Sequence, residues 1–401
     1  MTIPALDFDP YDEAVLADPF PHHAALRDAG PVVWLERYGC YAMARYAEVR
    51  DTLIDWQTFV SSRGVGLADF AKEEPWRPPS LLLEADPPLH QRTRGVMNRV
   101  VALPALKARL PEWRETASQL VAGLLERGTV DIVPDLAEAF PLRVFPDLIG
   151  LREEGREHLI PYAMSVFNAF GPRNALLAQS QIDAAKSTEW IAASCQRAFL
   201  KDTGWGSDIF AAADRGECTE AEAERLVRSL LSAGVDTTVN GIANMVHAFA
   251  AFPDEWHKLR ADLGLARRAI DESLRWGGVA QTFYRTTSRA VDVAGETLPE
   301  GSKVLLFLAA ANRDPRHWEN PDRFDIMRNT SGHVGFGFGI HQCLGQMVAR
   351  YEAEAVLGAL IEQVAEFRPT GKPARRLNNT LFALGSLPVE LVAAQSCART
   401  Q

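Results

Sequence analysis

The sequence predicts a mainly α-helical protein with small β-sheets. Apolar residues recur at helical spacing through most of residues 103–200. A second helical pattern of about 33 residues follows, and at 1.5 Å per residue it would be about 50 Å long. The patterns typical of β-strands are short by comparison and fall towards the two ends of the chain. Helices therefore dominate, and the strands form only small sheets.

Length, composition and charge exclude several classes of protein. The chain has 401 residues, 47% hydrophobic and 23% charged, and its length alone favours two or three domains. The formal net charge of −10 argues against a nucleic-acid-binding protein, which needs a basic surface. Five scattered cysteines without a Cys-x-x-Cys pair indicate neither a disulfide framework nor a zinc site. Residues 1–20 are acidic and lack an apolar run long enough for a signal sequence or membrane span, so we expect a cytoplasmic protein.

The first half of the chain alternates between clear elements and one long irregular segment. We expect a helix over 20–28, a hairpin with strands at 32–35 and 40–43, and a helix over 45–53. Glycine and proline punctuate residues 61–84, where we expect a packed loop. Two consecutive prolines at 87 and 88 then fit the start of a helix. Further helices are predicted over 106–127, 133–140, 141–149, 153–170 and 174–200.

The long central helix is the clearest single element. It begins with a capping box at Thr219 and Glu222 and ends before Pro253. Its middle reads Ala-Gly-Val-Asp-Thr-Thr over 233–238, and most of these residue types are poor helix formers in a buried interior. Threonine hydroxyls there can bond to the carbonyl four residues earlier and bend the helix. A weakened helix at this point indicates a site with room for a small ligand and ordered water.

The last third of the chain mixes short helices and strands. Two helices are predicted over 254–263 and 265–276, followed by strands at 281–285, 291–293 and 303–307. A polar irregular segment covers 312–332, and a helix is predicted over 344–364. Short strands near 381 and over 389–392 complete the order. No repeat and no interdomain linker interrupts it.

The segment 336–345, Phe-Gly-Phe-Gly-Ile-His-Gln-Cys-Leu-Gly, places a cysteine in a loop punctuated by glycines. Three glycines in ten residues indicate a backbone that turns sharply and passes close to something flat. At a helix start, the macrodipole and free N–H groups favour the thiolate of Cys343. On these grounds three interpretations stay open: a buried free cysteine, a catalytic nucleophile and a thiolate ligand to haem iron.

Several other residues allow both an ordinary and a functional interpretation. On the residues alone, charged side chains one helical turn apart are solvated faces or weak surface ion pairs more often than anion clamps. Aromatic side chains at helical spacing pack a core as readily as they line a pocket. These residues are the His90–Arg94 pair, the Glu272–Arg275 pair, the Phe167–Phe170 pair and Arg77.

The cysteine segment resembles the haem-binding signature of the cytochromes P450, Phe-Gly-x-Gly-x-His-x-Cys-x-Gly, at every position. An Ala-Gly-x-Asp-Thr helix, a Glu-x-x-Arg helix and a Pro-x-Arg-Phe segment precede it in order. The series is similar to a soluble bacterial cytochrome P450 from end to end. The resemblance implies one domain over 1–401, mainly α with small sheets, in which a long central helix lies over a haem and a cysteine-ligand loop. This replaces the two-domain expectation from length.

The resemblance also implies roles for individual residues. Cys343 is the axial thiolate ligand of haem b, and the residues that match propionate partners are His90, Arg94, Arg285 and His341. Asp236 and Thr237 match the acid–alcohol pair that delivers protons to bound oxygen. A buried structural triad is matched by Glu272, Arg275 and Arg323.

Four segments resemble more closely the bacterial P450s that oxidise para-substituted benzoates: 61–67, 75–80, 167–172 and 228–234. That resemblance implies O-demethylation of 4-methoxybenzoate by hydroxylation of the methoxy carbon and loss of formaldehyde. The carboxylate would be surrounded by Arg77, Ser80, Ser229 and Ser232, and the ring would lie by Ala233 among Phe167, Phe170 and Phe283. Two positions depart from these relatives. Phe338 replaces a small residue on the side of the sulfur, and Tyr284 replaces a Phe and is expected to add a polar group near the site.

The expected partners are a small aromatic carboxylate, O2, and a ferredoxin with its NAD(P)H-dependent reductase, all acting on a monomer. Candidate basic residues for ferredoxin docking are Arg94, Arg99, Arg109 and Arg350. One alternative is a P450 that acts on another small aromatic acid. A peroxide-driven haem-thiolate enzyme or dehydratase is another, although the intact Asp236–Thr237 pair argues against it. A non-catalytic haem sensor is more remote, because no signalling or DNA-binding domain is recognisable.

Overall fold

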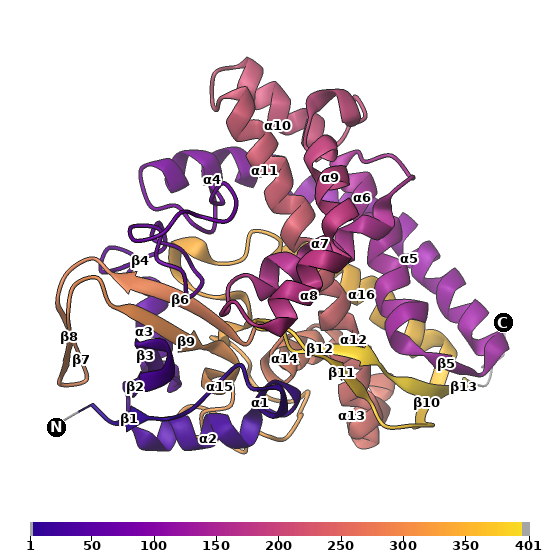
Figure 1. The fold of residues 1–401 in the computed structure, drawn as a ribbon. Coiled ribbons are helices and arrows are strands. Elements are labelled where there is room, and N and C mark those ends of the chain that lie inside the picture. The colour runs from indigo at the N-terminus through magenta and orange to yellow at the C-terminus, as the bar shows by residue number, and fades with distance from the viewer. Residues whose placement is uncertain (1–2, 395–401) are drawn as a thin grey trace.

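The structure of the protein, a computed structural model, describes residues 3–394. Helices fill one side of the molecule and the largest sheet lies on the other, within a triangular outline (Figure 1). No helix in the described residues is long and apolar enough to cross a membrane. The mainly α-helical class with small sheets is therefore as predicted.

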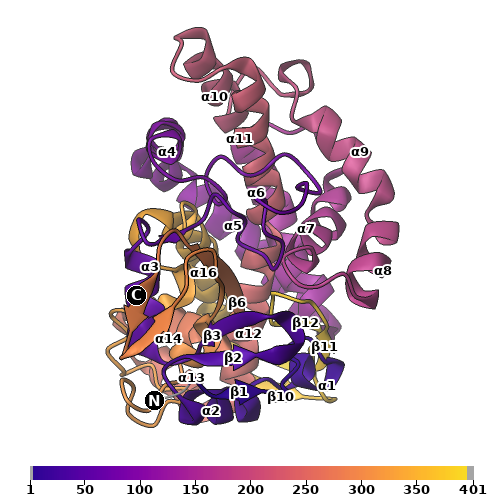
Figure 2. The ribbon, with the colours of Figure 1, turned by 60° about the vertical axis from the view of Figure 1, so that its left-hand side comes forward.

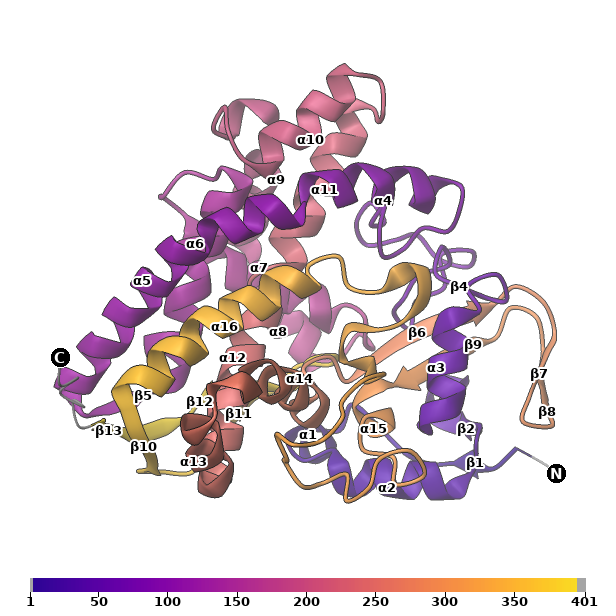
Figure 3. The same ribbon diagram turned by 180° about the vertical axis from the view of Figure 1, so that it is seen from behind.

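The helical side of the molecule is built around long, mostly buried helices. From behind, α16 lies alongside α5 (Figure 3). The helices of this side are α4 (Leu89–Val100), α5 (Leu103–Arg127), α6 (Ala139–Ile149), α7 (Leu159–Asn168), α8 (Ala175–Asp183), α9 (Ala185–Ser194), α10 (Trp205–Asp214), α11 (Glu220–Ala233), α12 (Asp236–Ala251), α13 (Pro253–Ala261), α14 (Ala266–Gly277) and α16 (Gln346–Gln363). Shorter helices accompany the sheet: α1 (Glu13–Ala17), α2 (Phe20–Ala29), α3 (Tyr46–Ile54) and α15 (Leu308–Ala311).

The largest sheet consists of β1 (Ala5–Leu6), β2 (Val33–Leu35), β3 (Cys40–Met43), β4 (Phe59–Val60), β6 (Thr282–Thr287) and β9 (Lys303–Phe307). Its strand order is β1-β2-β3-β9-β6-β4, so the N-terminal hairpin is joined to the later strands through β9. β6 and β9 are antiparallel, and Phe283 faces Leu306 in the register. The smaller sheets of the described residues are β5 (Thr129–Asp131) with β10 (Val364–Pro369) and β13 (Pro388–Ala393), β7 (Val291–Val293) with β8 (Glu296–Leu298), and β11 (Ala374–Arg376) with β12 (Ala383–Ser386).

The predicted central helix is two helices, α11 and α12, separated by Gly234 and Val235. The capping box at Thr219 and Glu222 is present at the start of α11. At the break, the Thr237 hydroxyl donates a hydrogen bond to the Ala233 carbonyl at 2.7 Å. A side chain at Gly234 would lie 1.9 Å from the ring of Phe145. The predicted weak point is confirmed, and α11 leads into α12 across it (Figure 2).

Three of the other predicted helices differ from the structure. The helix expected over 153–170 begins only at Leu159, because Gly155 takes a left-handed φ of 86°. The helix expected over 174–200 is divided at Ala184 into α8 and α9. The predicted 133–140 helix is a wider π-helical segment over Val133–Glu138. α10 was not predicted, because its ten residues are too short for a clear period.

Candidate active site

A cavity of about 300 Å³ lies between the α11–α12 break and the loop before α16. Cys343 lines it from the loop and Thr237 from the start of α12. Most other lining side chains are apolar. The cavity therefore brings together the two stretches that sequence singled out independently, the cysteine loop and the weak point of the central helix.

The loop carries Cys343 to the cavity through tight turns. The N–H of Cys343 donates to the Phe336 carbonyl at 2.8 Å, three residues before α16 begins. Gly339 has a left-handed φ of 69°, and a side chain there would lie 2.6 Å from the Leu53 carbonyl. Burial raises the pKa of the Cys343 thiol, whereas the Gly345 N–H and Arg94 lower it. A metal bound to this sulfur would favour the thiolate directly.

Buried basic side chains lie beside the cavity, and their partners indicate whether the site suits a haem with its anionic propionates. Arg285 is 4% exposed, and burial lowers the pKa of its guanidinium to about 10. Its Nη1 donates to the Tyr284 carbonyl at 2.8 Å, and Arg94 Nη2 donates to the Gln342 carbonyl at 2.7 Å. Both residues line the cavity, and Arg94 Nε also donates to Asn98 Oδ1 at 3.2 Å. Within residues 3–394 none of these acceptors is a carboxylate. An anionic ligand would supply the missing counter-charge.

Two histidines complete this basic region. His341 lines the cavity, and its Nδ1 lies 3.0 Å from the Leu82 carbonyl. Its Nε2 is 3.6 Å from Asp86 Oδ1, beyond hydrogen-bond distance. His90 lies next to it, with ring centroids 4.4 Å apart. Within residues 3–394 both Nε2 atoms are buried and without a hydrogen-bond partner. One thiol and several unsatisfied basic groups around one cavity fit a metalloporphyrin with two propionates.

Asp236 and Thr237 occupy different positions around the helix break. Thr237 lines the cavity, whereas the Asp236 carboxylate is 1% exposed and lies 3.1 Å from the Arg376 guanidinium. Burial raises the pKa of Asp236 to about 6, against the lowering effect of Arg376. Glu138, which also pairs with Arg376 at 2.9 Å, raises it further. The acid is therefore held next to the cavity wall by a contact that sequence did not indicate.

The residues expected around a substrate carboxylate all line the cavity, and most of them are linked by short contacts. The hydroxyls of Ser80 and Ser229 are 3.3 Å apart, and Ser232 is one turn further along α11. Arg77 lines the same cavity, and its guanidinium lies 3.2 Å from Glu84, which is 2% exposed in its side chain. The Glu84 carboxylate also accepts the Ser80 N–H at 2.8 Å. Sequence reasoning missed this buried counter-ion of Arg77.

The aromatic residues form the expected wall. The ring centroids of Phe167 and Phe170 are 5.9 Å apart, and those of Phe170 and Phe283 are 5.8 Å apart. All three rings line the cavity together with Ala233. A flat apolar ligand with an anionic group at one end matches this arrangement.

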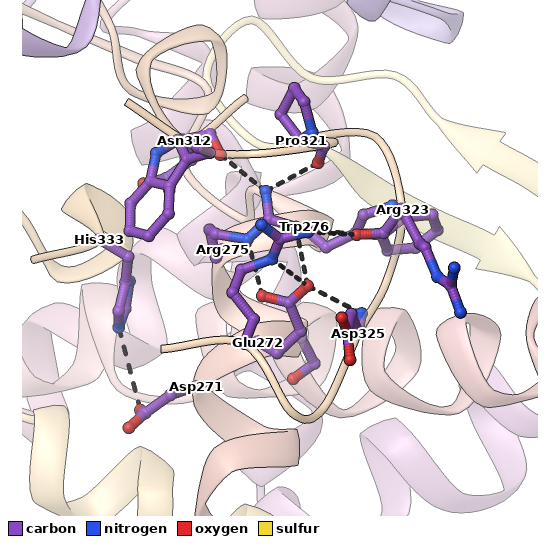
Figure 4. Close-up of polar contacts among 12 residues, drawn as sticks. Asp271, Glu272, Arg275, Trp276, Asn312, Pro321, Arg323, Asp325 and His333 are labelled. Carbon is purple, nitrogen blue, oxygen red and sulfur yellow. Dashed lines mark hydrogen bonds and ion pairs between the residues drawn. The ribbon is translucent and has the colours of Figure 1, made fainter. Parts of the chain in front are cut away.

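The expected structural triad needs one correction. Glu272 and Arg275 form a two-pronged ion pair with both side chains fully buried, so they are no surface pair. The Arg323 side chain is 61% exposed and points away from them, while only its carbonyl accepts from Arg275 (Figure 4). Arg328, 10% exposed in its side chain, donates to Glu272 at 3.2 Å instead. The turn at 320–323 directs the Arg323 side chain outward and its carbonyl inward.

The two departures from the benzoate-oxidising relatives lie on different faces. Phe338 lines the cavity on the cysteine side, under the Arg50 guanidinium at 5.3 Å. Tyr284 was expected to place a polar group near the site, and this is wrong. Successive strand residues face opposite sides of the sheet, so Phe283 faces the cavity and Tyr284 points away. The Tyr284 hydroxyl lies 2.8 Å from that of Tyr11.

Comparisons with known proteins agree with this geometry. The family model described as Cytochrome P450 matches residues 179–392. "Cytochrome p450 CYP199A2" of Rhodopseudomonas palustris is 54% identical over 98% of this chain and 95% of its own length. The "Beta-dihydromenaquinone-9 omega-hydroxylase" of Mycobacterium tuberculosis is 31% identical over 96% of this chain and 78% of its own. A solved structure of cytochrome P450 CREJ with (4-ethylphenyl) dihydrogen phosphate is 28% identical, with a TM-score of 0.87 over 96% of this chain and 99% of that one.

Proposed function

The chain belongs to the cytochrome P450 family, and from this membership we propose that it oxidises para-substituted benzoates. The proposed reaction is O-demethylation of 4-methoxybenzoate to 4-hydroxybenzoate and formaldehyde. As a member of the family the chain is a monooxygenase with haem b as its cofactor. Other small aromatic acids are the alternative substrates.

We assign Cys343 as the protein ligand of the haem iron. His90, Arg94, Arg285 and His341 are the proposed partners of its propionates, and the two histidine rings lie 4.4 Å apart. When bound, the haem supplies the activation of O2 and the oxidation of a carbon–hydrogen bond. The residues of the chain bind and orient the substrate, exclude water and deliver protons.

The presence of a hydroxyl and guanidinium cluster beside flat apolar walls in one cavity carries the substrate proposal. Hydroxyls at Ser80, Ser229 and Ser232 can donate to a carboxylate, and Arg77 provides positive charge nearby. The Phe170 and Phe283 rings limit the substrate ring to an edge-on or stacked position. A benzoate anchored by its carboxylate would then direct its para substituent away from the serines, further into the cavity.

Thr237 and Asp236 are the proposed path for protons. The Thr237 hydroxyl faces the cavity and can hold a water there, while Asp236 lies between the cavity wall and Arg376. A carboxyl with a pKa of about 6 takes up and releases protons near neutral pH. For delivery, the Asp236 carboxylate must leave Arg376, take up a proton and turn towards Thr237.

The overall reaction consumes O2, two electrons and two protons. One oxygen atom enters a methyl carbon–hydrogen bond, and the other leaves as water. The resulting hydroxymethyl ether breaks between its ether oxygen and the hydroxymethyl carbon. The hydroxyl proton passes to the ether oxygen, which gives the phenol and formaldehyde. We propose that a ferredoxin and its NAD(P)H-dependent reductase supply the electrons in the cytoplasm, to a monomer that acts as one domain over 1–401.

The expected docking arginines are partly neutralised. Arg99 pairs with Glu217, Arg109 with Glu112 and Arg350 with Asp271, whereas Arg94 reaches towards the cavity. The ferredoxin would therefore meet a mixed surface, and docking should depend on several weak charge pairs.

An optical titration of the ferric protein with 4-methoxybenzoate tests the proposed function. The acid should move the Soret band from its low-spin to its high-spin position, because it displaces water from the iron. The methyl ester, which lacks the charge, is the matched control and should bind far more weakly. A haem spectrum that the acid leaves unchanged would contradict the benzoate assignment. Turnover with peroxide alone, without NAD(P)H and ferredoxin, would favour a peroxygenase.

A further inference from the structure

A buried lysine outside the cavity holds three carbonyl groups of one loop. Lys303 begins β9 and is 8% exposed. Its Nζ donates to the carbonyls of Gly64 at 2.8 Å, Gly66 at 3.0 Å and Arg63 at 3.1 Å. An ammonium group has three N–H donors, so all of them are satisfied by this one loop.

The loop held by Lys303, residues 63–67, packs directly on the aromatic wall. The Leu67 N–H donates to the Phe170 carbonyl at 2.9 Å. A side chain at Gly66 would lie 2.7 Å from Phe170 Cα, so the loop backbone touches the Phe170 backbone. The position of this loop therefore sets where the Phe170 ring stands.

The same loop also contacts the strand that carries the facing ring. The Tyr284 N–H donates to the Val65 carbonyl at 2.9 Å, immediately after Phe283 in β6. β6 pairs with β9, so Lys303, Phe283 and the loop belong to one hydrogen-bonded unit. Lys303 thus lies where a single side chain can fix the spacing between Phe170 and Phe283.

Only a cation suits this position. Three carbonyl oxygens that converge on one point repel one another, and they are buried away from water. Removal of the ammonium would leave the buried carbonyls of Gly64 and Gly66 without this donor, whereas the partly buried Arg63 carbonyl would keep the Phe70 N–H at 3.1 Å. Burial lowers the pKa of Lys303 to about 7, and Arg63 and Arg285 lower it further, whereas Asp69 and Glu84 raise it. The three carbonyl acceptors therefore favour the ammonium form against the cost of burial.

We propose that Lys303 is a positioning residue for substrate binding. Its ammonium group fixes loop 63–67, and the loop fixes the Phe170 ring at the distance from Phe283 that grips a flat substrate. The binding part of this proposal rests on the proposed function, whereas the effect on the loop does not. Lys303 touches neither the substrate site nor the haem site itself.

Hydrogen exchange of the haem-loaded protein without substrate tests the effect on the loop. Lys303→Met keeps the apolar stem and removes all three donors, so the Leu67 amide should exchange about tenfold faster or more. Lys72→Met is the matched control, because it removes the same charge at an exposed site paired with Asp69 in the same region. The control should leave exchange at Leu67 unchanged. Unchanged exchange in Lys303→Met would overturn the proposal.

Binding titrations test the consequence for the cavity. The dissociation constant of 4-methoxybenzoate should rise about tenfold in Lys303→Met, and Lys303→Arg, which keeps the charge, should recover part of the loss. Tight binding in Lys303→Met despite fast loop exchange would overturn the link to Phe170. If the wild type binds no benzoate, the proposed function fails while the exchange result still decides the role of Lys303. Should Lys303→Met not load haem, Lys303→Gln keeps two donors and must still accelerate Leu67 exchange.

Discussion

The Asp236 carboxylate and the Arg376 guanidinium are 3.1 Å apart, although 140 residues separate them in the chain. Arg376 holds Glu138 at the same time, at 2.9 Å. The helix break presents Asp236, and β11 presents Arg376. The pair therefore links the first turn of α12 to the C-terminal sheets, and Arg376 lowers the pKa of the acid that directly precedes Thr237.

Replacement of Asp236 should slow turnover without weakening substrate binding. Asp236→Asn cannot release or take up a proton, so the product rate should fall about a hundredfold. The dissociation constant from the spin-state titration should stay within about twofold, because the carboxylate is turned towards Arg376 rather than the serines. Product rates and titrations on the same samples check this. If the dissociation constant rises by as large a factor as the product rate falls, Asp236 contributes to substrate binding instead.

The same residue should make stability depend on pH in a particular direction. Burial raises the pKa of Asp236 to about 6, above its ordinary value of 3.8, so the folded state binds the proton more tightly. Its contribution is present at low pH and is lost as pH rises through about 4 to 6. Relative to Asp236→Asn, the wild type should lose about 2 kcal/mol of unfolding free energy between pH 4 and pH 7. Denaturant unfolding of both proteins at the two pH values measures this difference, and a loss on acidification would contradict it.

Arg328 and Arg323 should differ in their effects on folding. Arg328→Gln removes a donor from the buried Glu272 and should cost about 1–3 kcal/mol of unfolding free energy. Arg323→Gln changes an exposed side chain and should cost less than about 0.5 kcal/mol. Chemical unfolding and haem content of the two variants provide the comparison. If Arg323→Gln is the more damaging of the two, its side chain has a role that the exposed position does not explain.

The charge balance of Arg77 and Glu84 should set which anions bind. The buried Glu84 carboxylate beside Arg77 repels a dianion more strongly than a monoanion. We expect 4-methoxyphenyl phosphate to bind at least about tenfold more weakly than 4-methoxybenzoate at pH 8. Glu84→Gln should reduce the difference in affinity between the two anions, and Ser229→Ala should weaken the binding of both. Spin-state titrations with both anions measure the two dissociation constants. Tighter binding of the phosphate than of the benzoate would contradict this account.

Tyr284 should matter for stability and not for the cavity. Tyr284→Phe removes the hydroxyl contact with Tyr11, and the cost should be about 1 kcal/mol. Substrate binding should be unchanged, whereas Phe283→Ala, one residue away on the other face, should weaken it strongly. Unfolding and titration of both variants separate the two faces of β6.

Sequence patterns predicted correctly the features that depend only on residues close together in the chain. The capping box at Thr219, the weak helix at Gly234 and the turns around Cys343 depend on neighbouring residues, and the structure has all three. The lining of the cavity by Arg77, the serines and the phenylalanines agrees with expectations that came from resemblance rather than from residue patterns. Their roles in binding stay predictions until they are measured.

Contacts between residues far apart in sequence could not be predicted, because they depend on how the whole chain folds. Nothing near Asp236 in sequence points to Arg376, and nothing near Arg77 shows that Glu84 turns back towards it. Arg323 and Arg328 lie in one polar segment, and only the folded turn decides which side chain faces Glu272. Tyr284 is adjacent to Phe283 in sequence, but alternate residues of a strand face opposite sides of the sheet, so the predicted polar group does not reach the cavity.

The Arg77–Glu84 contact gives Arg77 a counter-ion of the protein's own in the proposed substrate site. A guanidinium that already holds a carboxylate offers little to stray buffer anions, since each would have to compete with a neighbour that never diffuses away. In the proposed binding mode, a substrate carboxylate replaces Glu84 at Arg77 only with the help of the serine hydroxyls and the aromatic wall. Entry therefore resembles ion exchange, in which one carboxylate takes over from another, and selectivity arises from the exchange itself rather than from charge alone.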